Sequence, residues 1–321
     1  MLLAAHVLGG LLSLAGMLHA SENASYLEAR QKFEAGEYLL AMLAAQKAVE
    51  EEPEQAGHRH LYGLVLMELK QFNDSKIQLR KAAALEPDNA EFQYSLGATL
   101  VQEKKERLAP GSSDERLLLL WRIFPVPVVG TEAETLQALK RAVELDPSHL
   151  EARTQLGRTY YEQDRHDLAL QQFRAIEKKD PDYPWIHYHL SVLLGDMGAV
   201  QDALQALERE VERYPDHWYA RLELGELLEK TGRLQSALGH LLQAEKERSG
   251  SADVQYALAK VYRGLGETEK ALASALQCIE LDPGFIDAHY LVGQLYRESG
   301  QPERSRTAID RFERLKRGGR L

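Results

Sequence analysis

Several residues suited to molecular recognition recur in this sequence at a fixed separation. Tyr256 and Tyr290 are 34 positions apart, and so are Arg263 and Arg297. Tyrosine combines a rigid apolar ring with a hydroxyl group, and arginine can hold a carboxylate through two parallel hydrogen bonds. This pattern favours the binding of another molecule over the making or breaking of covalent bonds.

Catalytic and metal-binding patterns are absent from the sequence. It contains no GxGxxG, GxxxxGK[ST], HExxH or GxSxG motif. His58 and His60 are two positions apart, as are His187 and His189, whereas a pair of metal ligands on a helix needs a separation of three or four. We therefore expect these histidines at the surface or in a groove. We also expect no enzyme activity, no metal site and no cofactor.

A period of 34 residues organises most of the chain, and such a period is typical of stacked repeats. One break interrupts it, between Pro87 and Pro147, where the separation is 60, or 34 plus 26. The residues that mark the period are Pro53, Pro87, Pro147, Pro181, Pro215, Ser249 and Pro283.

Two helices are predicted in each period. Small residues recur at two places, such as Gly157 and Ala169, and apolar residues such as Tyr160 and Phe173 follow them at spacings of three and four. These spacings are helical, and small residues let two helix backbones approach closely. Glycine marks the turn between the two helices, at Gly36, Gly198, Gly232, Gly266 and Gly300.

The combined pattern resembles the tetratricopeptide repeat (TPR). It is most complete at Leu156, Gly157, Tyr160, Ala169, Phe173 and Pro181, and it covers about eight repeats from roughly Glu22 to Phe312. The resemblance implies an all-α fold, a right-handed superhelical solenoid of helix-turn-helix repeats over residues 21–321. Glu210 and Cys278 fill a slot where the pattern calls for a small residue, and we expect Cys278 to be a packed core thiol.

TPR proteins usually bind peptides in a concave groove lined by the first helices, so the resemblance implies such a groove here. Lys260, Arg263 and Arg297 would form a basic pocket in it, which suits an acidic or C-terminal peptide. The tyrosines also match the packing preference of the family, and both interpretations stay open. Adding the period gives the expected groove residues, Tyr94, Arg158, Tyr161, Trp185, Tyr188, Tyr219, Tyr256, Lys260, Arg263, Tyr290 and Arg297.

The net charge of the chain is −10 at pH 7. A nucleic-acid partner would require a basic face, so we expect a protein or peptide partner and no nucleic acid. The predicted function is a non-catalytic scaffold that assembles complexes through the groove.

The first 20 residues form a separate segment, MLLAAHVLGGLLSLAGMLHA, without Asp, Glu, Lys or Arg. It resembles a secretory signal ending at Ala20, which predicts export to a periplasm or outside the cell. It is also long enough to span a bilayer, which would tether the protein to a membrane. A capping helix on the solenoid is the third interpretation.

The break in the period corresponds to an insertion at about residues 105–130, inside the third repeat. It carries the apolar residues Leu119, Trp121 and Phe124, and inserted loops often carry function. The insertion would fold back on the solenoid, bind a partner or dip into a membrane. If it binds a partner, the chain would be an accessory module of an envelope enzyme or glycan pathway, which is the alternative function.

Overall fold

The computed structural model describes residues 23–108 and 132–318. All regular secondary structure in these residues is α-helical. The chain divides into two compact units, unit 1 up to Asp180 and unit 2 from Pro181.

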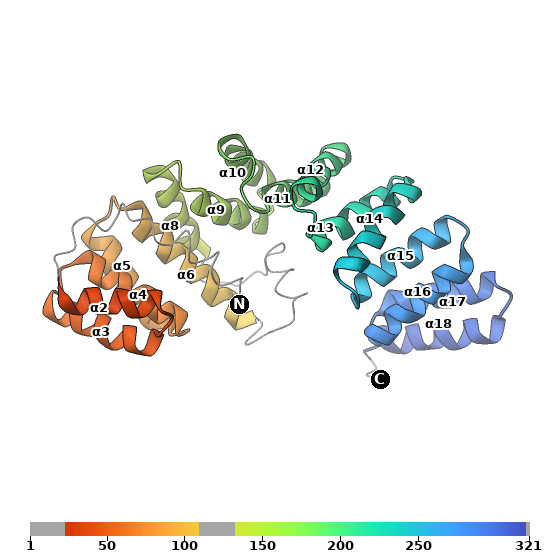
Figure 1. The fold of residues 1–321 in the computed structure, drawn as a ribbon, viewed down its shortest axis with the longest axis horizontal. Coiled ribbons are helices and arrows are strands. Elements are labelled where there is room, and N and C mark those ends of the chain that lie inside the picture. Colours follow the sequence, from red (N-terminus) through yellow and green to blue (C-terminus); the bar gives the residue numbers. More distant parts are fainter. Residues whose placement is uncertain (1–22, 109–131, 319–321) are drawn as a thin grey trace. The chain divides into compact units, whose positions relative to one another are not determined.

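Unit 1 contains four helix pairs, shown in red to green in Figure 1. Its helices are α2 (Ala24–Glu34), α3 (Tyr38–Glu51), α4 (Ala56–Glu68), α5 (Phe72–Leu85), α6 (Ala90–Leu108), α8 (Glu132–Leu145), α9 (Leu150–Glu162) and α10 (His166–Lys179). Unit 2 also contains four pairs: α11 (Ile186–Asp196), α12 (Val200–Arg213), α13 (Trp218–Lys230), α14 (Leu234–Glu247), α15 (Ala252–Gly264), α16 (Thr268–Leu281), α17 (Ile286–Glu298) and α18 (Pro302–Lys316).

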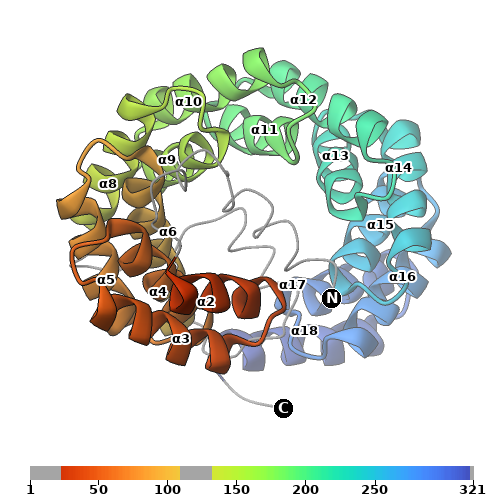
Figure 2. The ribbon, with the colours of Figure 1, turned by 60° about the vertical axis from the view of Figure 1, so that its left-hand side comes forward.

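Each first helix packs most closely on the second helix of its own pair, and each second helix also contacts the next first helix of its unit. Within unit 2 the first helices α11, α13, α15 and α17 form one layer and the second helices form the other (Figure 2). The described part of the chain therefore confirms the predicted α-solenoid of about eight helix-turn-helix repeats.

The small residues of the period lie where the two helices of a pair come closest. A methyl group placed on Gly225 would lie 2.6 Å from the Leu241 side chain, and one placed on Gly157 would lie 2.6 Å from the Phe173 ring. Leu241 and Phe173 are buried, so neither the Phe173 ring nor the branched Leu241 side chain has space to move away. A larger residue at these slots would force the two backbones apart.

In the helix pairs whose turn lies among the described residues, the turn uses a residue in the left-handed region, as predicted at Gly36, Gly198, Gly232, Gly266 and Gly300. Lys70 and Asp164 occupy the equivalent position in two repeats, with φ of 58° and 55°. A residue other than glycine is strained in this region. The chain nevertheless forms two of these turns without glycine, and the glycine pattern did not predict them.

The third repeat has a longer first helix than the others. Helix α6 contains 19 residues and continues to Leu108, so residues 105–108, which we assigned to the insertion, belong to it. The predicted contact residues Leu119, Trp121 and Phe124 lie outside the described residues, and so does the N-terminal segment 1–20.

Charged side chains hold the far end of α6 against its neighbours. Lys76 of α5 lies 2.6 Å from Glu103, and the two side chains are only 10% and 6% exposed. Lys70 pairs with Glu106 at 2.8 Å, and Lys104 pairs with Glu162 of α9 at 2.5 Å. A buried ion pair is costly to break from one side, so these contacts fix the end of the helix from which the insertion departs.

The expectation that the paired histidines lie at the surface or in a groove was wrong for three of them. His58, His60 and His187 are buried. The His60 Nε2 atom lies 2.8 Å from the Ser95 hydroxyl, and burial lowers the pKa of His60 to about 3. A helical repeat has more buried positions than its signature residues show, and a neutral imidazole can fill one when it finds a hydrogen-bond partner. Cys278 is buried as expected.

Candidate peptide-binding surface

Three predicted groove residues belong to unit 1. Tyr94 of α6 is only 7% exposed, and its ring centre lies 4.5 Å from that of His149, the residue that caps α9. Tyr161 stacks on His166 at 5.6 Å, and Arg158 is half-buried on α9. The Tyr94 ring is thus part of the core and leaves little surface for a ligand.

Trp185, Tyr188 and Tyr219 come together in unit 2, with His217 against Trp185 and Tyr188 and with Tyr219 against Tyr188. The Trp185 and His217 ring centres are 3.9 Å apart, and the Tyr188 and Tyr219 ring centres are 5.9 Å apart. Tyr188 is fully buried, whereas Trp185 and Tyr219 are half-buried. Trp185 precedes α11 with φ of 68°, an uncommon conformation for a large side chain.

The contacts of the Glu210 side chain explain why this position departs from the repeat pattern. Glu210 occupies a slot that is alanine in half of the repeats and is 1% exposed. Its carboxylate accepts a hydrogen bond from the Tyr188 backbone N–H at 3.3 Å and lies 3.0 Å from the His217 Nδ1 atom. The buried carboxylate therefore joins α11, α12 and the start of α13.

A ladder of charged contacts crosses the first helices of unit 2. Lys260 of α15 pairs with Glu229 of α13 at 2.9 Å. Arg263, one turn further along α15, donates to Gln294 of α17 at 2.7 Å and pairs with Glu298 at 2.6 Å. Each basic residue reaches a neighbouring first helix, so most of its charge is balanced within the chain.

Carboxylates dominate the same face of α13. Burial, together with the nearby Glu226 carboxylate, raises the pKa of Glu223 to about 7. Burial also raises the pKa of Glu226, against the opposing effect of Lys260. Tyr219 donates its hydroxyl to Glu223, and burial raises the pKa of this tyrosine as well. These carboxylates are hard to ionise mainly because they are buried, and a cation placed beside them would favour their ionised form.

The remaining predicted residues stay accessible on α15 and α17. Tyr256 is half-buried with Lys260 5.8 Å from its ring centre, and Tyr290 is 43% exposed. Arg297 is exposed and forms no ion pair with another described residue. Tyr256, Lys260 and Arg263 lie on one side of α15, and Arg263 reaches Gln294, one turn after Tyr290 on α17. The Tyr290 ring also lies 5.1 Å from that of Phe312 on α18. Glu223, Glu226 and Glu229 were not among the predicted groove residues. Adding the period to the groove positions gives Glu226 and Glu229, so the sequence contained a signal for these two.

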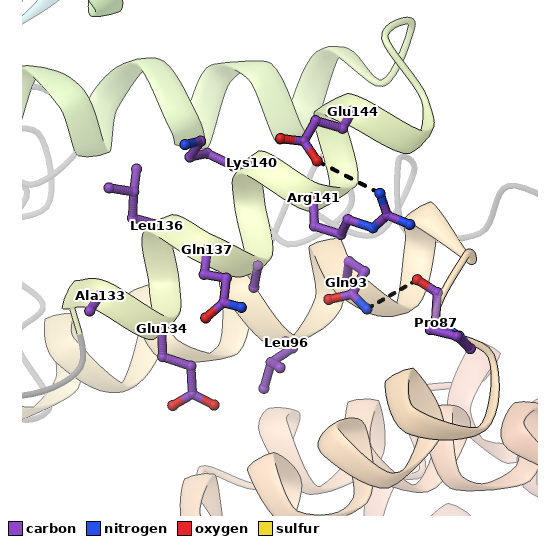
Figure 3. Close-up of a pocket in the computed structure, with 11 residues that line it drawn as sticks. Pro87, Gln93, Leu96, Ala133, Glu134, Leu136, Gln137, Lys140, Arg141 and Glu144 are labelled. Atoms are coloured by element: carbon purple, nitrogen blue, oxygen red, sulfur yellow. Dashed lines mark hydrogen bonds and ion pairs between the residues drawn. The ribbon is translucent and has the colours of Figure 1, made fainter.

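A separate cavity of about 720 Å³ lies in unit 1 between α6 and α8. Figure 3 shows Gln137 and Arg141 of α8 beside Leu96 and Gln93 of α6, whereas the side chain of Lys140 points away from them. Arg141 is engaged by Glu144 at 3.7 Å and by Asp88 at 2.6 Å. The cavity contains none of the predicted groove residues.

Residues 23–108 and 132–318 contain no cluster of three His, Cys, Asp or Glu side chains that could hold a metal ion. None of the helices in this described part is both long enough and apolar enough for a membrane span.

Comparison with known proteins identifies the repeat. Models described as tetratricopeptide repeat match residues 130–193, 190–252 and 252–285. No curated protein matches the sequence.

Solved structures share the fold at low sequence identity. "MamA 41-end from Desulfovibrio magneticus RS-1" is 19% identical with a TM-score of 0.50, over 53% of this chain and 96% of that one. The "APC/C hetero-tetramer Cut9-Hcn1" structure is 14% identical with a TM-score of 0.54, over 87% of this chain and 50% of that one. At such identities the likeness concerns the fold alone.

Proposed function

We propose that this chain, which belongs to the tetratricopeptide repeat family, is a non-catalytic scaffold that binds a peptide segment of a protein partner on the first helices of unit 2. The observation that carries the proposal is the accessible face formed by Tyr256, Lys260 and Arg263 of α15 with Tyr290 of α17. Tyrosine and arginine are among the residues that most often dominate the binding energy of protein interfaces.

The charges of this face favour a partner with lysine or arginine side chains. An acidic peptide would need Lys260 and Arg263 to be available, but Glu229 and Glu298 already pair with them. Glu223 and Glu226 lie on the neighbouring helix, and their raised pKa values reflect burial without full compensation. A cationic side chain near them would stabilise both ionised carboxylates, and it would also find the Tyr219 and Tyr256 rings for cation–π contact.

Site-specific photo-crosslinking in the native cell tests where the partner lies. A photoreactive phenylalanine analogue replaces Tyr256 or Tyr290 in two variants, and Tyr262 in the control. Tyr262 lies on the same helix as Tyr256 but six residues further along, so its side chain points about 120° away around the helix axis, and its ring contacts Lys270 of α16. We expect partner adducts from positions 256 and 290 and none from 262. Equal adducts at all three positions, or none at 256 and 290, would contradict the proposed surface.

The charge preference is tested on the crosslinked peptide itself. Glu226→Gln should weaken its binding because the variant removes a negative charge from the face. Lys260→Gln should strengthen it because Glu229 then loses its partner. The opposite pair of effects would show that the partner is acidic, as the sequence first indicated.

A further inference from the structure

The outer face of α3 carries three leucines that are exposed to solvent. Leu39, Leu40 and Leu43 are 66%, 50% and 59% exposed. Residues 39 and 43 are one helical turn apart, and so are residues 40 and 43, so the three side chains adjoin one another. The opposite face of α3 is buried through Ala41, Ala44, Ala45 and Ala48.

The seven later repeats do not share this apolar face. The residues equivalent to Leu39 are Asn73, Ala133, Asp167, Gln201, Gln235, Glu269 and Glu303. Among the equivalents of Leu40 and Leu43, only Leu168 and Ile77 are large and apolar. The first repeat therefore departs from the common pattern at three adjoining positions, which the repeat fold does not require.

The first repeat also follows the uncharged segment 1–20 directly. Asn23 caps α2, and its side-chain amide donates to Glu51 and Glu52 at 3.1 Å each. The start of α2 thus lies beside the end of α3, and only residues 21 and 22 separate it from the apolar segment. From residue 20 to Asn23 the chain makes three steps and spans at most about 11 Å, so any surface that the segment enters is close to α3.

We propose that the outer face of α3 lies on a lipid bilayer that residues 1–20 enter. Leu43 is eight residues from the end of α3 at Glu51, which is about 12 Å along a helix, so its side chain is within reach of the same bilayer surface. Exposed leucines transfer favourably from water to the bilayer interface. Lys47 lies between the leucines and that end, 67% exposed and 3.7 Å from Glu51, and its long side chain can exchange this exposed ion pair for the headgroups.

A bilayer is a better environment for residues 1–20 than the leucine face of α3 would be. Residues 1–20 contain no charged residue, so a helix formed by them would be apolar on every side. On the surface of α3 such a helix would leave one apolar side in water, whereas a bilayer surrounds it with lipid.

An environment-sensitive fluorophore on a single cysteine tests the proposal in the full chain. Cys278→Ala removes the buried native thiol and places the residue found at that slot in four other repeats, Ala48, Ala82, Ala142 and Ala244. The probe is attached to Leu43→Cys or, as the matched control, to Ala273→Cys, the exposed equivalent in α16. Both proteins are reconstituted into phosphatidylcholine vesicles containing lipids with a quencher on the acyl chain.

We expect a blue-shifted emission and loss of most of the fluorescence at position 43, with neither effect at position 273. Adding Leu39→Ser and Leu40→Ser to the Leu43→Cys protein should restore the fluorescence. Equal, water-like emission at both positions would overturn the proposal. A blue shift at position 43 that the lipid quencher does not affect would assign the face to residues 1–20 or to a second copy of the chain. Protein isolated from its native cells with its N-terminus at Ser21 would also overturn it.

Discussion

Gly225→Ala and Gly239→Ala make the same chemical change in the two helices of one repeat, and we expect them to have opposite effects on stability. Gly239 lies in the middle of α14, and a methyl group there would meet no atom within 4 Å. Alanine is better than glycine inside a helix by about 0.5–1 kcal/mol. Gly239→Ala should raise the free energy of unfolding of unit 2 by that amount.

At Gly225 the added methyl group would lie 2.6 Å from both Cγ and Cδ2 of Leu241. Leu241 is fully buried, so its branch cannot turn into solvent, and overpacking of this kind costs about 1–3 kcal/mol. The gain in helix propensity offsets part of that cost. Gly225→Ala should therefore lower the free energy of unfolding by about 0.5–2 kcal/mol, which separates the two variants by roughly 1–3 kcal/mol.

The chain already contains the compensated form of this contact. Ala29 faces the position of Ala45 in the first repeat, and Ala259 faces that of Ala275 in the seventh; all four are buried. Leu241→Ala alone should cost about 2–5 kcal/mol because it leaves a cavity. Combined with Gly225→Ala it should cost about 1–2 kcal/mol less than the sum of the two single effects.

Urea unfolding followed by tryptophan fluorescence measures these effects, since Trp185 and Trp218 lie in unit 2 and Trp218 begins α13. Amide hydrogen exchange in α13 gives a local check. If Gly225→Ala stabilises unit 2 as much as Gly239→Ala does, the close approach at Gly225 is not the reason for the small residue, and the argument from the period fails there.

Three further predictions concern buried charge and protonation. Glu103→Gln should lower the free energy of unfolding of unit 1 by about 3 kcal/mol because it leaves buried Lys76 without its ion pair, whereas Glu106→Gln, in the more exposed pair with Lys70, should cost less than about 1 kcal/mol in urea unfolding. The folded pKa of Glu223 is raised to about 7 from 4.5, so its contribution to stability is present below pH 4.5 and lost as the pH rises through 7; Glu223→Gln should raise the melting temperature of unit 2 at pH 8 but not at pH 4. The folded pKa of His60 is lowered to about 3 from 6.5, so its contribution to the stability of unit 1 is present above pH 6.5 and lost as the pH falls towards 3. His60→Leu introduces the residue found at the equivalent position, Leu222, and should reduce the loss of unit 1 stability between pH 6.5 and pH 4. An unchanged pH profile would contradict the view that buried, neutral His60 causes this loss.

The period predicted the helix pairs because it records packing that every repeat must satisfy. The slot at Gly225 and the turn at Gly232 each follow from a backbone constraint, a close approach in one case and a left-handed conformation in the other. Lys70 and Asp164 show the limit of this reasoning, since two repeats form the same turn with a strained residue. The end of α6 at Leu108 was also missed, because the ion pairs that hold it, such as Lys76 with Glu103, join residues 27 positions apart and leave no local pattern.

The accessible part of the candidate site was harder to predict. The position of a residue within the repeat fixes the direction of its side chain but not which neighbouring residues cover it. Three tyrosines of one row pack against the residue that caps the first helix of the following repeat: Tyr94 against His149, Tyr188 against His217 and Tyr256 against Phe285. The same position is therefore 7% exposed at Tyr94, fully buried at Tyr188 and 43% exposed at Tyr290, depending on how completely its neighbours close over it. The tyrosine row is thus first a packing contact between successive repeats. It becomes available to a ligand only on α15 and α17, where the covering is incomplete, and this is why we assign recognition to that part of unit 2.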